Sequence, residues 1–432
     1  MPDISVFEAR AEAILGLRKN FFPDLFFQSD TTEEPLRVRL PDQPISCVRF
    51  ELSEPGALHL GSMSLEDADG KISDLSNAAL HTSSVYPGSE KALDARLFFE
   101  KQWARVGFHT KKDRAPWAEA RLPVAGAYRR LIVNNRSGKW ASRAWALRIK
   151  VQTAESEWLE VYDHQARRRM FEAVLTGSIA GYPPEDHPAI GAFDRIVLEA
   201  LAGEFRGMKK NLRAEPGVSR QDKADMRKVV NDRILLSREV EWTTHGVTRS
   251  FRFWSDAEKI EYLKEANQLV EDLRAVTPDV CLGFGSVLSI VRDRNLIPHD
   301  DDLDIIIAFP RSVAAKFPDG LKIVTEHLSA RGYAVKGGYV SHRHVSLRGS
   351  KAVDVFVGVY EDEDRVTWFP GPRATLKRDD IFPPIDAPLF GVPCAIPRNP
   401  FLYLEKIYGA EWGVPKPRWH HKWDRETVSD LL

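Results

Sequence analysis

The stretch from Leu282 to Ile307, LGFGSVLSIVRDRNLIPHDDDLDIII, constrains the fold of this chain more than any other. It begins with a small glycine turn, continues as an apolar amphipathic run, and then sets four carboxylates in front of three isoleucines. The four carboxylates are Asp300, Asp301, Asp302 and Asp304. The apolar run from Leu303 to Phe309 predicts a short β-strand that is buried on both faces.

Asp302 and Asp304 stand two residues apart where this strand begins, so their side chains project to the same side. Two unpaired carboxylates at that spacing repel each other unless a cation lies between them. Hard oxygen ligands on one face suit Mg²⁺ or Mn²⁺, which usually bind one or two carboxylates together with substrate phosphates. The alternative is a solvated acidic loop that simply precedes a strand.

Two further features favour the metal site. The turn at Gly285 and Ser286 offers backbone N–H groups that can face a phosphate. A third carboxylate, Asp354, lies inside the apolar run Val353–Val357, where an unpaired charge is costly. Together these features predict a phosphate-binding turn followed by three carboxylates on neighbouring strands.

This arrangement resembles the nucleotidyltransferase superfamily of DNA polymerase β type, and most closely its LicD/fukutin branch, whose members carry a phrase like GTLLGAVR…FIPWDDDIDI. The matching residues are Gly285, Ser286, Leu288, Val291, Arg292, Leu296, Ile297, Pro298, Asp300, Asp301, Asp302, Asp304 and Ile305. The segment Phe401–Gly409 is similar to the YLEKxYG element of the same branch. The resemblance spans roughly residues 250 to 420, and the chain departs from it at His299 and Val357.

The resemblance implies a nucleotidyltransferase-like mixed α/β domain that uses Mg²⁺ or Mn²⁺. Asp302 and Asp304 would hold the cation against a diphosphate, and Asp354 would complete the metal site or accept a proton from the attacking hydroxyl. Other residues would support these three. Asp300 would add a ligand, Gly285 and Ser286 would cradle phosphate oxygens, and Arg292 and Lys406 would offset developing negative charge.

Histidines near these motifs have less certain roles. His342 and His344 lie two apart on an expected strand next to Asp354 and are candidates for substrate binding. A zinc pair is disfavoured, because no partner ligand is evident in the nearby sequence. The cluster Trp419–Trp423, which includes His420 and His421, predicts either a packed C-terminal segment or a contribution to donor binding.

The N-terminal half differs in pattern. Short alternating segments recur between turn residues from about Glu34 to Asp163, which is typical of an all-β sandwich. The sequence from Gly107 to Asp163 resembles discoidin-like (galactose-binding-like, F5/8 type C) modules, which have a jelly-roll fold and often bind glycans. Candidate glycan contacts are the loop residues Trp103, His109, Lys111, Asp113 and Trp140.

We therefore expect a multidomain α+β chain. Its parts are an N-terminal helical and aromatic segment (1–33), a β-sandwich (34–165), a helical linker (166–245) and a LicD-like catalytic domain (246–432). The helical pattern of the linker falls in three segments, at 166–179, 188–212 and 221–241.

Composition narrows the setting. The formal net charge of −1 gives no support for bulk binding of nucleic acid. Three widely spaced cysteines, Cys47, Cys281 and Cys394, are expected to be buried thiols in a reducing compartment. The N-terminus lacks a signal-peptide pattern and no apolar run reaches membrane-spanning length, so we expect a cytoplasmic protein that could act at a membrane surface.

The first functional hypothesis follows the LicD resemblance. It is the transfer of phosphocholine or a polyol phosphate from a CDP-linked donor to a sugar hydroxyl of a surface glycan, such as capsule or lipopolysaccharide, or of its lipid-linked precursor. The second is a nucleotidyltransferase that moves a nucleoside monophosphate from an NTP to a small molecule. The third is a glycan-binding protein with an inert catalytic fold.

Overall fold

The structure is a computed structural model that describes residues 3–27, 34–88, 98–99, 108–136, 138–178, 188–243, 245–347, 350–416, 421 and 423–432. By its internal contacts the chain divides into two units, Met1–Arg238 and Glu239–Leu432. Each unit combines helices with β-sheets, as expected for a multidomain α+β chain. The four-part division drawn from the sequence stays a prediction, as do the jelly-roll and nucleotidyltransferase-like folds.

The β-rich part of the first unit contains antiparallel sheets. One has the strand order β10-β9-β2-β7-β5, another has the order β1-β8-β4, and β3 pairs with β6. The strands are β1 (Leu36–Arg39), β2 (Ile45–Leu52), β3 (His59–Leu60), β4 (Ser62–Glu66), β5 (Ala79–Thr82), β6 (Phe108–His109), β7 (Trp117–Gly126), β8 (Arg130–Asn134), β9 (Leu147–Thr153) and β10 (Trp158–Asp163). The alternating segments of the sequence thus form strands, because period-2 patterns bury one face of a sheet.

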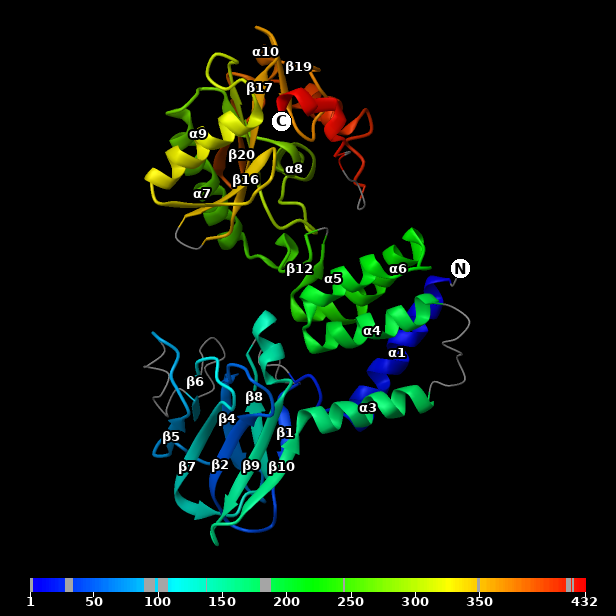
Figure 1. The fold of residues 1–432 in the computed structure, drawn as a ribbon, viewed down its shortest axis with the longest axis vertical. Coiled ribbons are helices and arrows are strands. Elements are labelled where there is room, and N and C mark those ends of the chain that lie inside the picture. The colour runs from blue at the N-terminus through cyan, green and yellow to red at the C-terminus, as the bar shows by residue number, and fades with distance from the viewer. Residues whose placement is uncertain are drawn as a thin grey trace. The chain divides into compact units, whose positions relative to one another are not determined.

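Helices complete the first unit. They are α1 (Ile4–Phe21), α3 (His164–Ser178), α4 (Pro188–Ala202), α5 (Phe205–Ala214) and α6 (Arg220–Val230). Helix α1 packs against α4 and α6, and Figure 1 shows these three helices side by side. The segment expected as a linker therefore packs with the N-terminal helix within one unit. The helix predicted over 188–212 is interrupted at Gly203, whose φ of +70° is a conformation that favours glycine.

The aromatic stretch after α1 forms part of the core of this unit. Phe22, Leu25, Phe26 and Phe27 are buried, whereas Phe21 is exposed. Phe26 and Phe27 both make edge contacts with the ring of Trp145. The stretch therefore belongs to the core of the unit and does not form an exposed aromatic patch for a partner.

The second unit is organised around a seven-stranded sheet whose main order is β13-β14-β17-β16-β15, with β18 and β19 added beyond β17. Its strands are β13 (Val280–Leu282), β14 (Asp304–Phe309), β15 (Tyr333–Lys336), β16 (His342–Leu347), β17 (Val353–Tyr360), β18 (Arg365–Trp368) and β19 (Leu376–Lys377). Strands β14 and β17 pair in parallel, and the other strand pairs described in this sheet are antiparallel.

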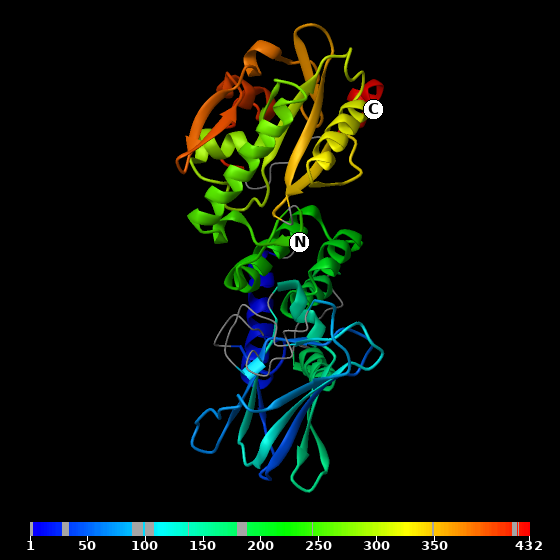
Figure 2. The same ribbon diagram turned by 90° about the vertical axis from the view of Figure 1, so that its left-hand side faces the viewer.

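Helices α7 (Asp256–Arg274) and α9 (Phe317–Ala330) contact the sheet and each other, so they cover one face of it (Figure 2). The remaining elements are β11 (Glu241–Trp242), β12 (Val247–Thr248), α8 (Phe284–Leu288), a π-helical turn η6 (Ser289–Asp293), α10 (Arg378–Ile381), the hairpin β20 (Ile385–Leu389) and β21 (Val392–Ile396), α11 (Pro400–Tyr408) and η7 (Arg425–Leu431). Helix α7 begins with a capping box between Ser255 and Glu258.

Gly320 allows α9 to approach the sheet closely. A Cβ at this position would lie 2.5 Å from Val357 Cγ1 and 3.0 Å from Phe309 Cδ2. We expect Gly320→Ala to destabilise the protein by about 1–3 kcal/mol through overpacking, despite the better helix propensity of alanine. Thermal unfolding of the full chain measures this, with Gly338→Ala as the control, because a Cβ there meets nothing within 4 Å. A melting temperature that rises in Gly320→Ala would contradict the close packing.

Candidate functional site

The parallel pairing of β14 with β17 places two of the predicted carboxylates opposite each other. In the register of these strands Asp304 faces Asp354, and the N–H of Asp354 donates to the carbonyl of Leu303 at 2.8 Å. Both aspartates lie near the beginning of a strand, and the strand residues that follow each of them are buried. The pairing brings together residues that lie fifty positions apart in the sequence.

The turn before α8 fits tightly against β14. A Cβ at Gly283 would lie 2.5 Å from Ile306 Cγ2, so only glycine allows this approach. The N–H of Gly285 donates to Asp304 Oδ2 at 3.0 Å, and the N–H of Asp304 donates to Ser286 Oγ at 2.7 Å. The turn thereby fixes the Asp304 side chain at the edge of the sheet.

This geometry gives Gly285 and Ser286 partners within the protein. Both were predicted to cradle phosphate oxygens, but the Gly285 N–H already binds a carboxylate and Ser286 is buried. Arg292 forms a two-pronged ion pair with Asp293 and donates to the carbonyl of Trp412. Lys406 is exposed on α11. The structure therefore brings Asp304 and Asp354 together. The residues predicted to contact phosphate either bind other groups of the protein, are buried, or, like Lys406, lie at the surface.

The carboxylates at this edge have unusual electrostatics. Burial raises the pKa of Asp304 and of Asp302 well above the usual value, and neighbouring carboxylates raise both further. Burial also raises the pKa of Asp300. Asp302 Oδ2 lies 3.8 Å from His245 Nδ1, but the acids at this edge outnumber their cationic neighbours. Such a group of carboxylates fits a site that a divalent cation would occupy.

Asp301 behaves differently because it has cationic partners. Its Oδ1 lies 2.9 Å from His245 Nδ1, and its Oδ2 accepts a hydrogen bond from Lys351 Nζ at 2.7 Å. Burial acts to raise the pKa of Asp301, but these two partners outweigh it and lower the pKa to about 2. The hydrogen bond to Asp301 in turn raises the pKa of His245 to about 9. Asp301 therefore anchors two cations beside the other acids.

Sequence reasoning missed these two cations and a third residue, Tyr262. No local pattern marks His245 or Lys351, which lie on either side of the acidic run in the sequence. Tyr262, on α7, accepts a hydrogen bond from the N–H of Leu303 at 3.1 Å and donates to the carbonyl of Ala352. Its hydroxyl therefore joins the beginnings of the two strands that carry Asp304 and Asp354.

A second group of possible ligands adjoins the first. Among the residues that the structure describes, two sets have ligand atoms within 4.8 Å of one another. One contains His245, Asp300, Asp301 and Asp302, and the other contains His342, His344 and Asp354. The predicted trio of Asp302, Asp304 and Asp354 is not such a set, although the register makes Asp304 and Asp354 neighbours.

The C-terminal aromatic cluster packs near these acids. The ring of His421 lies 5.3 Å from that of Phe284 and 5.5 Å from that of Tyr408. Trp423 packs edge-on against Phe369 at 5.3 Å. These contacts agree with a packed segment, whereas Trp419 and His420 lie outside the described residues.

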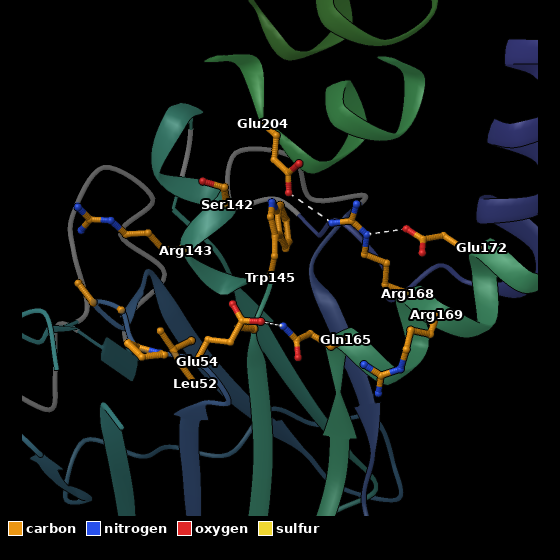
Figure 3. A pocket seen from close by; sticks show the side chains of 14 residues that line it. Leu52, Glu54, Ser142, Arg143, Trp145, Gln165, Arg168, Arg169, Glu172 and Glu204 are labelled. Carbon is orange, nitrogen blue, oxygen red and sulfur yellow. Dashed lines mark hydrogen bonds and ion pairs between the residues drawn. The ribbon is translucent and has the colours of Figure 1, made fainter. Parts of the chain in front are cut away.

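The first unit contains a pocket of about 560 Å³ beside its β-rich part. Figure 3 shows that charged side chains line it and that several of them pair with one another. Arg168 bonds to Glu172 and Glu204, and the amide of Gln165 donates to Glu54. None of the described candidate glycan contacts lines this pocket: His109, Lys111, Asp113 and Trp140. Trp103 lies outside the described residues.

His109 is instead engaged in a stack of rings. Its imidazole lies 4.2 Å from that of His59 and 4.4 Å from the ring of Tyr86, nearly parallel to both. Arg143 contacts His109 Nε2 at 2.9 Å and lies over the Trp140 ring at 4.3 Å. Arg143 thus connects these loop residues, and glycan binding at them stays a prediction.

Comparison with known proteins adds one family match. Residues 279–399 match the model of the family described as LicD/FKTN/FKRP, nucleotidyltransferase domain. The matched segment contains β13, β14 and β17 with their carboxylates, so the C-terminal part of the chain carries a domain of this family, as the motifs implied. The resemblance of the N-terminal part to discoidin-like modules stays a prediction.

The other comparisons add little. The search of curated proteins found no match. A solved structure described as "Crystal Structure of ANT(2")-Ia in complex with adenylyl-2"-tobramycin" is 14% identical and aligns over 39% of this chain and 84% of its own. Its TM-score of 0.25 is too low to carry any argument about fold or activity. Separately, none of the helices that the structure describes has the length and apolar character needed to cross a membrane.

Removing the charge of Asp304, which is half-buried, tests the like-charge repulsion in this cluster. We expect Asp304→Asn to stabilise the metal-free protein by about 1 kcal/mol, because the amide removes like-charge repulsion and can still accept from Gly285. The raised pKa means that folded Asp304 binds protons more tightly than unfolded Asp304 does, so wild-type stability falls as pH rises above about 4. The gain should therefore be small at pH 4 and larger at pH 8. Melting curves in a chelator at both values measure it, and a loss of stability at pH 8 would contradict the unpaired charge.

The Tyr262 hydroxyl offers a second test. Tyr262→Phe leaves the Leu303 N–H and the Ala352 carbonyl without their partner, so we expect a loss of about 1–3 kcal/mol in the free energy of unfolding. Urea unfolding checks this, with Tyr339→Phe as the matched control, because that ring is 52% exposed. Equal stability of the two variants would show that the hydroxyl does not hold the strands.

Proposed function

We propose that this protein is a metal-dependent phosphotransferase. It moves a phospho-substituent, such as phosphocholine or a polyol phosphate, from a CDP-linked donor to a sugar hydroxyl of a surface glycan or its precursor. The observation that carries the proposal is the parallel register that sets Asp304 against Asp354 beside Asp302, inside the segment that matches the LicD/FKTN/FKRP family.

Mg²⁺ or Mn²⁺ would be held by Asp302, Asp304 and Asp354, with Asp300 as a further ligand. The raised pKa values of Asp302 and Asp304 support this assignment, because burial and mutual repulsion leave these acids in need of a counter-charge. When bound, the cation would neutralise charge on the donor diphosphate. The oxygen-only donor set of these four residues suits a hard cation.

The protein's own groups would then position the reactants. Asp354 would accept the proton of the sugar hydroxyl as its oxygen attacks the phosphorus that bears the substituent. The bond from that phosphorus to the bridging oxygen breaks, and CMP leaves. Lys351 and His245, which Asp301 holds beside the acids, would attract the donor's phosphates.

A second candidate is transfer of a nucleoside monophosphate from an NTP to a small molecule. It is favoured by the description of the matched family, which names a nucleotidyltransferase domain. The two reactions use the same acids but release different products. CMP marks the first reaction and pyrophosphate marks the second.

The acceptor and the setting belong to the same proposal. A glycan acceptor, free or lipid-linked, would suit a chain whose N-terminal part resembles glycan-binding modules. We propose a cytoplasmic enzyme that could associate with a membrane surface and that has no nucleic-acid partner.

Incubation of the full chain with CDP-choline, CDP-glycerol or CDP-ribitol, Mg²⁺ and a panel of glycans tests the proposal. We expect CMP release with at least one donor, and a fall of about 100-fold or more in kcat/KM for Asp302→Asn and for Asp354→Asn. The matched control is Asp386→Asn, an exposed acid on β20, which should keep its activity. Pyrophosphate release from NTPs without CMP release from any CDP-linked donor would favour the second candidate. Activity retained in Asp302→Asn would overturn both.

A further inference from the structure

Strand β16 presents two imidazoles to the carboxylate of Asp354. His342 and His344 stand two residues apart on this strand, so their side chains project to one face. Strand β17 pairs with β16 so that His344 lies opposite Asp354. The neighbouring strand β17 therefore contributes a third possible metal ligand, the carboxylate of Asp354.

The three side chains are close enough to share one ion. One ligand atom from each lies within 4.8 Å of the others. His342 Nε2 is 3.7 Å from Asp354 Oδ2, and His344 Nδ1 forms a hydrogen bond with Asp354 Oδ1. Two ligands on one tetrahedral zinc ion, with bonds of about 2.0–2.2 Å, lie about 3.4 Å apart. The separation at His342 is near that value.

The surroundings hold His342 in a defined orientation. Its ring stacks on Tyr339 at 4.3 Å and packs against Phe356 at 4.6 Å, and its side chain is buried. Its Nδ1 lies 3.0 Å from Ser341 Oγ. When Nδ1 carries the proton and donates to this hydroxyl, Nε2 keeps its lone pair for a metal, as in many protein metal sites.

His344 has room to adjust. Its side chain is 36% exposed, so it can turn from its hydrogen bond with Asp354 to a coordinating position. Three protein ligands would leave a further position for water or a substrate oxygen, which is the pattern of reactive rather than structural zinc sites.

We propose that His342, His344 and Asp354 bind a divalent transition metal of the zinc and cobalt class. Two imidazole nitrogens favour such a metal over Mg²⁺, which prefers oxygen ligands. This site differs from the proposed all-oxygen site in its two imidazole ligands, and Asp354 would be a ligand of both sites. It does not depend on which group-transfer reaction the protein performs.

Titration of the metal-free full chain with Co²⁺ tests the site directly, because nitrogen-ligated Co²⁺ of low coordination number absorbs visible light. We expect one equivalent of Co²⁺ to give such a spectrum at pH 7.5, Zn²⁺ to displace it, and millimolar Mg²⁺ to leave it unchanged. His344→Gln and His342→Gln should each weaken Co²⁺ binding by about tenfold or more.

Two controls separate this site from the rest of the chain. His81→Gln, an exposed histidine on β5, should bind Co²⁺ like the wild type. Asp302→Asn should also keep the spectrum, so that loss of group-transfer activity and loss of the nitrogen-ligated site can be told apart. Melting curves establish that each variant is folded.

Three results would overturn the inference: no visible Co²⁺ spectrum in the wild type, displacement of Co²⁺ by millimolar Mg²⁺, or an unchanged spectrum in both folded histidine variants. Should either variant fail to fold, the wild-type spectrum and its response to Mg²⁺ still decide the question. If any of the three results is found, the hydrogen bond between His344 and Asp354 is an ordinary packing contact.

Discussion

The second unit depends on a group of carboxylates crowded at one edge of its sheet, where the acids outnumber their cationic neighbours His245 and Lys351. Asp302 and Asp304 each have a pKa raised by burial and by their acidic neighbours. A folded protein keeps such an arrangement at a cost in stability, since like charges in a poorly solvated place repel. Sites of this kind are often functional, because a bound cation and an anionic substrate can relieve the strain.

The surrounding structure holds the acids in place. Gly283 allows the turn to approach β14, and the Gly285 N–H fixes Asp304. Tyr262 joins the beginnings of β14 and β17 through a single hydroxyl. These contacts come from the turn, the sheet and α7. Regular elements therefore position Asp304 and Asp354, whereas Asp300 and Asp302 lie in the irregular segment that leads into β14.

Much of this could be predicted from the sequence because the signals are local. The isoleucine run after the acids predicted β14, and the alternating pattern before residue 163 predicted strands. The match to the LicD/FKTN/FKRP family supports the assignment made from the Gly-Ser turn and the acidic run. In each case neighbouring residues carry the pattern.

The rest depends on contacts between distant residues. Sequence reasoning put Arg292 near the phosphates, but Asp293 beside it and the Trp412 carbonyl hold its guanidinium. It placed His342 and His344 on a strand next to Asp354 but disfavoured a metal pair there, because the register that sets His344 opposite Asp354 is visible only in the structure. His245 and Lys351 meet at Asp301 from opposite sides of the acidic run. The spacing of these residues in the sequence does not predict such contacts.

We propose that Asp304 and Asp354, with Asp302, form a site for a hard divalent cation. Electron paramagnetic resonance of Mn²⁺ added to the metal-free chain measures binding at this site, since bound Mn²⁺ loses the sharp signal of the free ion. We expect saturable binding that Mg²⁺ competes away and that Asp304→Asn and Asp354→Asn each abolish. Mn²⁺ that stays free at millimolar protein, or binds equally well to both variants, would contradict it.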